Sequence, residues 1–260
     1  AARNVVCSGA KPLAITNCLN FGNPQDPEIY WQFKESVLGM GEMCRELNTP
    51  VTGGNVSFYN ETKDGAVYPS PVIGMVGLID DINNLMTVNF KEKDDLIVVL
   101  GSLNGQLGGS EYLKILHNKV EGPISNINIS LERKVQETCL EAIKAGLLNS
   151  AHDLSDGGLS VSLAESVIMS DSNLGAEINV VRKLEDVELL FGECPSVIVV
   201  TLNQDNLYNL VKIAKSHDIH TQTIGKVTDN NHLIINDLIS LSKDTLKDCY
   251  YNALKEKMSD

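Results

Sequence analysis

Apolar side chains recur every three or four positions between Asp26 and Leu47, which is the period of an α-helix packed on one side. Asp26 is a favourable N-cap, Pro27 suits the first helical position, and Glu28 places an acid in the first turn. The pattern therefore predicts a helix over 26–47. The apolar stripe that we expect this helix to bury consists of Tyr30, Phe33, Val37, Met40, Cys44 and Leu47.

Short apolar runs before and after this helix predict the strands of the same domain. A strand over Leu13–Thr16 should lead into an asparagine-rich loop over 17–24. Pro50 ends the helical pattern, and Gly53–Gly54 should form a turn ahead of a strand over Val56–Tyr59.

Three further features complete this first unit. Ala1–Cys7 is typical of the end of a helix with Gly9 as its C-cap. Asp64–Gly65 is a hairpin turn signal, and the apolar run Pro71–Asp80 predicts a long buried strand. Strand, helix, strand, hairpin and strand make an α+β unit.

Helices and strands alternate through the second part of the chain, which indicates an α/β domain with a mixed sheet. Strands are expected over 96–100, 150–153, 196–202, 219–227 and 233–235, and helices from Glu111 onward and over 130–146, 158–169, 205–217 and 242–255. The polar stretch 83–95 separates the two patterns, so we predict domains over 1–88 and 89–260.

Charge and cysteine usage narrow the class of protein. The formal net charge is −13 and basic residues form no run, which argues against nucleic acid or an anionic membrane as the main partner. No apolar run reaches the roughly 20 residues that a membrane span needs. The six cysteines are scattered without metal-ligand spacing, which favours free thiols and a cytoplasmic location. Cys18 is interpreted as a small buried thiol.

The segment Thr52–Asn60 carries the clearest candidate chemistry. Two adjacent glycines let a ligand approach the backbone without a Cβ in the way. Asn55 and Ser57 should point to the same side of an extended chain, because side chains alternate along a strand. Bare backbone beside an amide oxygen and a hydroxyl suits phosphate and a hard cation. The alternative is an ordinary Gly-Gly-Asn turn without function.

Three segments, taken together, resemble phosphoribosylformylglycinamidine synthase, specifically the second half of its synthetase chain (subunit II). They are Ala14–Pro24, Thr52–Asn60 and His152–Leu159. The resemblance implies one two-domain half of an aminoimidazole ribonucleotide synthetase-like fold, with a ferredoxin-like first domain truncated at its start and a mixed-sheet α/β second domain. Because the chain opens inside a helix without Met, we expect it to be a piece that lacks the first half.

The family's reaction follows from the same resemblance. Formylglycinamide ribonucleotide, ATP and glutamine-derived ammonia give the amidine, ADP and phosphate, with Mg²⁺ as the metal. The resemblance implies that Asn17 and Gly54 contact ATP, Asn55 binds magnesium and Ser57 contacts the substrate. It places the catalytic histidines and acidic magnesium ligands in the missing half, so this chain should supply one wall of the site and no catalytic residue. Implied partners are that half, a glutamine amidotransferase subunit and a small bridging subunit, and the piece itself could form a homodimer.

The sequence suggests more than one role for two further segments. The loop 102–110 contains Gly105, Gly108 and Gly109 before a predicted helix, which makes it a weak candidate anion cradle. Asp153 could contact a metal or phosphate, or it could hold the turn at Gly157–Gly158 by accepting backbone hydrogen bonds. His152 is interpreted as structural, since it and Asp153 should face opposite ways on a strand.

Other functions on the same architecture remain open at this stage. By resemblance it also serves aminoimidazole ribonucleotide synthetase, selenophosphate synthetase, thiamine-monophosphate kinase and a hydrogenase-maturation protein, all of which use ATP. A different kind of function is a non-catalytic scaffold that retains a structural nucleotide.

Overall fold

The computed structural model describes residues 1–124, 126–171 and 173–259. The chain divides into two compact units, the first made of 1–6 and 10–80 and the second of 7–9 and 81–260. The opening helix α1 (Ala2–Cys7) is present as expected, and Gly9, with a φ of 85°, follows its end.

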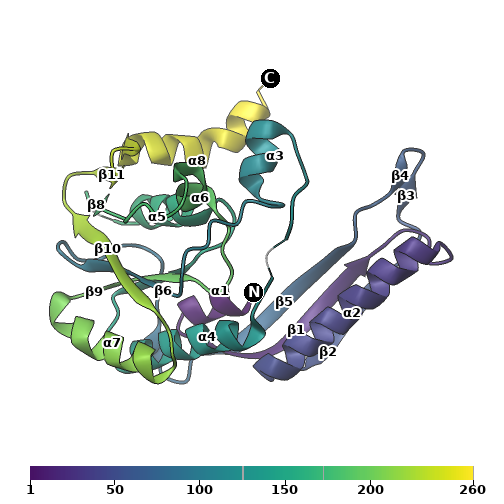
Figure 1. Ribbon diagram of the computed structural model, residues 1–260, viewed down its shortest axis with the longest axis horizontal. Coiled ribbons are helices and arrows are strands. Elements are labelled where there is room, and N and C mark those ends of the chain that lie inside the picture. The colour runs from purple at the N-terminus through teal and green to yellow at the C-terminus, as the bar shows by residue number, and fades with distance from the viewer. Residues whose placement is uncertain (125, 172, 260) are drawn as a thin grey trace. The chain divides into compact units, whose positions relative to one another are not determined.

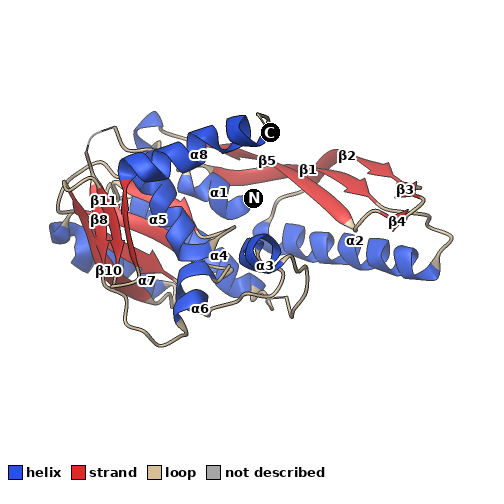
Figure 2. Ribbon diagram, turned by 90° about the horizontal axis from the view of Figure 1, so that it is seen from above, coloured by secondary structure: helices blue, strands red, loops and turns tan. Residues whose placement is uncertain are grey.

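The first unit is a three-stranded sheet with one long helix along it (Figures 1 and 2). Its strands are β1 (Lys11–Asn20), β2 (Val51–Ser57) and β5 (Ser70–Leu78), in the order β2-β1-β5. β1 runs parallel to β2 and antiparallel to β5. The helix α2 (Pro27–Leu47) connects β1 to β2, and a small hairpin of β3 (Glu61–Thr62) and β4 (Gly65–Ala66) turns at the predicted Asp64–Gly65.

The two asparagine- and glycine-rich segments are strands, contrary to the expected loop and turn. β1 continues through Asn17 to Asn20, and Gly53 and Gly54 lie within β2. Neither Asn nor Gly favours a strand intrinsically. Here β1 is the central strand and bonds to a neighbour on both sides, so the ladders override the local preference.

The sequence prediction overestimated how far the apolar stripe on α2 is buried. The helix has its expected N-cap, since Asp26 Oδ1 accepts from the N–H of Glu28 at 2.8 Å, and no residue of α2 is buried. Phe33 packs edge-on between Phe21 and Phe58, whereas Tyr30 is 54% exposed. A three-stranded sheet is too narrow to cover a helix of 21 residues, so the flanks of the stripe remain exposed.

The strand expected to be buried over 71–80 is also more exposed than predicted. Along β5 half-buried positions alternate with exposed ones, and Val72, Val76 and Leu78 are 59, 66 and 51% exposed. This alternation is typical of a sheet that is covered on one face only.

The second unit is built on a seven-stranded mixed sheet. Its strands are β6 (Leu96–Leu100), β7 (Ser150–Asp153), β8 (Gly175–Ile178), β9 (Ile198–Leu202), β10 (Thr221–Thr228), β11 (His232–Ile235) and β12 (Ile239–Ser242). Their order is β12-β11-β8-β10-β6-β9-β7, and only the β11–β8 pair is parallel among these described strands.

Helices cover both faces of this sheet (Figure 1). On one side lie α5 (Gly158–Ile168), α6 (Asp186–Phe191) and α8 (Lys243–Lys257), and on the other lie α4 (Ile129–Lys144) and α7 (Leu207–Ser216). The short helix α3 (Glu111–His117) follows the glycine-containing loop, and 3₁₀ turns occupy Ile82–Asn84 and Gln204–Asn206.

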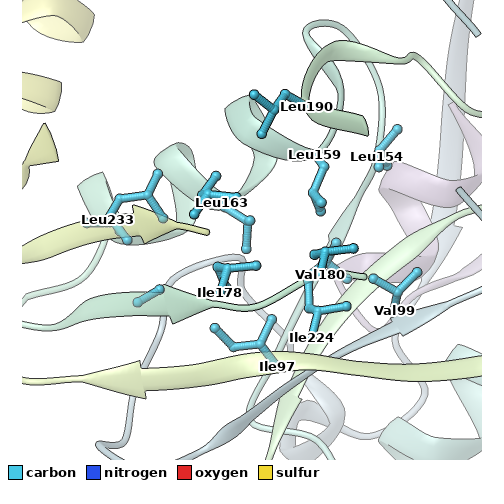
Figure 3. Packing of buried hydrophobic residues seen from close by; sticks show 14 of the residues in the cluster. Ile97, Val99, Leu154, Leu159, Leu163, Ile178, Val180, Leu190, Ile224 and Leu233 are labelled. Atoms are coloured by element: carbon cyan, nitrogen blue, oxygen red, sulfur yellow. The ribbon is translucent and has the colours of Figure 1, made fainter. Parts of the chain in front are cut away.

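A hydrophobic core cluster lies between the sheet and α5 (Figure 3). Leu159, Leu163 and Val167 recur along one face of α5 and pack against Ile97 and Ile178 of the sheet. These side chains are fully buried, so they contribute directly to the hydrophobic stabilisation of this unit.

Most elements predicted in this unit are present. The helix predicted to start at Ser130 has Asn128 as its N-cap, whose Oδ1 accepts from the N–H of Leu131 at 3.0 Å. The strands β8 and β12 and the helix α6 were not predicted. Each strand has four residues and the helix has six, which is too short for a clear periodicity of apolar and polar positions.

Candidate functional site

The face of the first sheet that carries Thr16, Cys18 and Asn20, here called the open face, is an ordered array of small and polar residues. The strand register places Gly53, Thr16 and Gly74 in one row across the three strands. The next row is Asn55, Cys18 and Val72, and the last is Ser57, Asn20 and Ser70. These side chains share a face because neighbours across a ladder point the same way.

Asn17 and Gly54 are paired across β1 and β2 and lie in close contact. A Cβ on Gly54 would overlap both the side-chain oxygen and the backbone oxygen of Asn17. The side chain of Asn17 therefore lies over Gly54, toward the edge strand β2. Only glycine permits this approach, which gives Gly54 a steric reason to be glycine.

Gly53 presents bare backbone on the open face. A Cβ there would have no atom within 4 Å, and Gly53 O accepts a hydrogen bond from Thr16 Oγ1 at 2.9 Å. β2 is the edge strand of the sheet, so one side of its backbone has no ladder partner. A phosphate group can approach such a glycine edge without steric hindrance.

Two carboxamides flank one thiol on the open face. Asn20 Nδ2 lies 3.7 Å from Cys18 Sγ, and Asn55 Nδ2 lies 4.0 Å from the same sulfur. Asn20 Nδ2 also lies 3.5 Å from the carbonyl oxygen of Ser70. Cys18 is half-buried, so the expectation of a small buried thiol is wrong.

Ser57 ends β2 beside a turn that Asn60 holds. Asn60 Nδ2 donates to Ser57 O at 2.9 Å and to Phe21 O at 3.2 Å, and Ser57 Oγ lies 3.4 Å from Asn60 Oδ1. Tyr59 adopts a left-handed φ of 59° in this turn. The hydroxyl of Ser57 is thus held at the end of the row that contains Asn20 and Ser70.

The four residues predicted for the site fall on two faces of the same strand pair. Asn55 and Ser57 are on the open face, whereas Asn17 and Gly54 point to the face along which α2 runs. Gly54, Asn55 and Ser57 lie on the edge strand β2 itself, and Asn17 lies over Gly54 of that strand. The sequence did not assign Cys18 or Asn20 to the site. Their place beside Asn55 becomes apparent only when β1 is known to extend to Asn20.

The side chains present on these strands limit how a metal ion could be bound. Across the described ranges, no three His, Cys, Asp or Glu side chains gather closely enough to hold a metal ion. Asn55 and Ser57 offer neutral oxygens, which are acceptable ligands for Mg²⁺ but neutralise none of its charge. These residues fit one side of a magnesium–phosphate site.

His152, interpreted from the sequence as structural, bridges β7 and α5. Its Nε2 lies 3.0 Å from Glu165 Oε2 and its Nδ1 lies 2.8 Å from the backbone oxygen of Asp153. Burial lowers the pKa of this imidazole, but the hydrogen bonds to Glu165 and to Asp153 O and the nearby carboxylates outweigh it, so the pKa is raised above 6.5. A protonated ring that donates to both oxygens accounts for this direction.

Glu193 occupies the place where the glycine loop was expected to hold an anion. Its Oε1 accepts from the N–H of Glu111, at the start of α3, and from the N–H of Gly157, at the start of α5, each at 2.9 Å. The carboxylate thus satisfies backbone donors at two helix N-termini. The N–H of Gly157 thus donates to the carboxylate of Glu193, in the turn that the sequence had offered as one of two possible roles for Asp153. Glu193 had no sequence signal, because it follows α6, far along the chain from both helices.

The fold and the two-unit organisation define a class of protein. The family model "AIR synthase related protein, N-terminal domain" matches residues 1–79, and "AIR synthase related protein, C-terminal domain" matches residues 92–237. The chain belongs to this family.

Curated relatives within the family carry one name. The chain is 47% identical over 230 residues to "Phosphoribosylformylglycinamidine synthase subunit PurL" of Alkaliphilus metalliredigens (strain QYMF), covering 88% of this chain and 31% of that protein. It is 42% identical over 262 residues to the subunit PurL of Thermoanaerobacter sp. (strain X514), covering 99% of this chain and 35% of that protein. The chain therefore spans about a third of the length of these relatives.

Solved structures agree with the fold. The chain resembles Thermotoga maritima PurL complexed with ATP (TM-score 0.70, 19% identity, covering 94% of this chain and 39% of that one). It also resembles T. maritima PurL complexed with FGAR (TM-score 0.72, 18% identity, 95% and 41%). Escherichia coli HypE has the same architecture (TM-score 0.66, 16% identity, 93% and 76%). At these identities the likeness concerns the fold alone.

No helix in the part of the chain that the structure describes is long and apolar enough to cross a membrane.

Proposed function

We propose that this chain forms one wall of the active site of an ATP-dependent C–N ligase, phosphoribosylformylglycinamidine synthase. The enzyme converts formylglycinamide ribonucleotide, glutamine-derived ammonia and ATP to formylglycinamidine ribonucleotide, ADP and phosphate. The observation that carries the proposal is the glycine edge of β2, where Asn17 lies over Gly54 and Asn55 and Ser57 stand on the open face. Relatives at 42–47% identity carry the synthase's name, which favours it over other ATP-dependent members of the family.

In this proposal each residue has a role that its position supports. Asn17 and the backbone of Gly54 bind the nucleotide, Asn55 offers its amide oxygen to Mg²⁺, and Ser57 contacts the substrate. Phosphoryl transfer to an amide oxygen depends on positioning and on neutralised charge. This wall contributes positioning by neutral donors, and Mg²⁺, when bound, contributes charge. The remaining charge would come from the other half of the synthase.

The proposal extends to location and partners. We place the protein in the cytoplasm, assembled with the other half of the synthase, a glutamine amidotransferase subunit and a small bridging subunit. One solved relative is titled as the structure of PurLQS from T. maritima, which supports an assembly of this kind.

The test uses the full-length polypeptide that contains this chain. Asn55→Ala should raise the Mg²⁺ concentration needed for half-maximal ATP use, and excess Mg²⁺ should recover part of the rate, because water can fill the vacant position. Losing one neutral oxygen ligand should cost on the order of 1–3 kcal/mol. Asn17→Ala should raise KM for ATP without rescue by Mg²⁺.

The matched control is Asn83→Ala, an exposed asparagine outside the site. If Asn55→Ala lowers the melting temperature and leaves the Mg²⁺ requirement unchanged, the residue only forms the strand. A nucleotide that stays bound through gel filtration, with activity unaffected by both site variants, would favour the scaffold function instead.

A further inference from the structure

The thiol of Cys18 sits at the centre of the open face, between the two carboxamides that the array contains. Cys18 is on the central strand and pairs with Asn55 on β2, while Asn20 lies two residues further along β1. The nitrogens of both carboxamides lie near its sulfur, at 3.7 Å for Asn20 and 4.0 Å for Asn55. Cys18 thus contacts side chains of both β1 and β2.

A second acceptor beside the sulfur shows which way the Asn20 amide is turned. Its Nδ2 also lies 3.5 Å from Ser70 O, a carbonyl oxygen that can only accept. The amide nitrogen therefore points toward the sulfur and the carbonyl, and the amide oxygen Oδ1 is directed away from them. The side-chain amide of Asn55 contacts the sulfur of Cys18, so its orientation depends on Cys18.

We infer that Cys18 is a positioning residue, whose sulfur holds the carboxamides of Asn20 and Asn55 with their oxygens turned toward ligand. The inference adds Asn20 to the polar groups of the site, and its link to Mg²⁺ rests on the proposed function of Asn55. A cysteine sulfur suits this task because it is a weak acceptor that two amides can share.

The positioning of the two carboxamides can be tested by a measurement that does not depend on activity. In the 260-residue chain, three-bond couplings across χ1 report whether Asn20 and Asn55 keep one rotamer. Cys18→Val removes the sulfur acceptor and replaces it with a side chain of similar size that is favourable in a strand. Both asparagines should then average between rotamers. Cys18→Ser keeps an acceptor, so the couplings should stay closer to those of the wild type. Cys44→Val makes the same change on α2 and should alter neither asparagine.

The functional readout uses the full-length polypeptide. Cys18→Val should raise the Mg²⁺ concentration for half-maximal ATP use by about three- to tenfold, as expected for the loss of one orienting hydrogen bond, with Cys18→Ser in between. MgATP should slow alkylation of Cys18 by N-ethylmaleimide, located by peptide mass spectrometry, and should leave exposed Cys249 unaffected.

Unchanged couplings in Cys18→Val would overturn the inference, whether or not the melting temperature falls. If the couplings respond while neither Cys18→Val nor Asn55→Ala changes the Mg²⁺ requirement, Cys18 positions the amides as inferred and the proposed magnesium role of Asn55 is wrong.

Discussion

The side chain of Asn17 occupies the space that a Cβ on Gly54 would need. Gly54→Ala should therefore destabilise the first unit by about 1–3 kcal/mol, because the strands must part to accommodate the methyl group. Gly53→Ala is the matched control, since its Cβ would meet no atom within 4 Å. It should be neutral or slightly stabilising, because alanine lowers the entropy of the unfolded chain. Thermal unfolding of the two variants checks the difference, and equal losses would contradict it.

The 260-residue chain by itself should lack synthase activity. The described residues around Asn17 and Gly54 include no cluster of acids and bases that could neutralise a transferring phosphoryl group. With formylglycinamide ribonucleotide, ATP and ammonia, phosphate release should match the buffer blank, while the full-length polypeptide is active. Substrate-dependent release by the purified chain would show that the wall is a complete site.

The open face should drive self-association of the isolated chain. Val72, Val76 and Leu78 point outward from β5 with more than half of their surface exposed, and such an apolar patch on a sheet favours association. Sedimentation velocity should show a concentration-dependent dimer that Val76→Lys weakens. Val181→Lys, at a similarly exposed valine of the second unit, should have no effect. A monomer at every concentration would exclude this surface.

Protonation of His152 should stabilise the second unit at low pH. Its folded pKa is raised above the ordinary 6.5, so the folded state binds more protons than the unfolded state between the two values. This contribution is complete below pH 6.5 and is lost as the pH rises through the folded pKa. Melting temperatures measured upward from pH 6 should fall more steeply in the wild type than in Glu165→Gln, which lacks the carboxylate. Parallel curves would argue against the ion pair.

Removal of the Glu193 carboxylate should loosen two helices at once. Glu193→Ala deletes acceptors for the N–H groups of both Glu111 and Gly157, and should cost on the order of 2–4 kcal/mol. Glu193→Gln keeps an oxygen without the charge and should cost less. Amide hydrogen exchange should accelerate at Glu111 and Gly157 together. The exposed Glu121→Ala is the control, and acceleration at one site only would mean that the bridge is not shared.

The sequence predicted elements well where one local signal dominated. Asp26, Pro27 and Glu28 marked the start of α2 correctly, and the fully apolar run Leu96–Leu100 is a strand as expected. Prediction failed where pairing overrode local preference, as in β1, which continues through asparagines because it bonds to strands on both sides. Burial on α2 was overestimated because periodicity records which side is apolar and not how much protein covers it.

The sequence pattern identified the two segments that carry the candidate site. It did not show on which face of the sheet each of their side chains lies. Alternation correctly put Asn55 and Ser57 on one side, yet only the register shows that Asn17 and Gly54 point to the other. Glu193 shows the same limit, because a carboxylate that caps two distant helices leaves no local pattern. Contacts between segments far apart in sequence require the fold.

The row that contains Asn55 and Cys18 ends in Val72, so polar ligand groups and the apolar patch share one continuous surface. A chain that packs on Val72 would lie against the same row that a ligand contacts. Binding of the ligand and binding of the partner would then be thermodynamically linked, and the ligand must change the affinity for the partner by the same factor by which the partner changes the affinity for the ligand. A titration of either one, repeated with and without the other, measures that single factor from both sides.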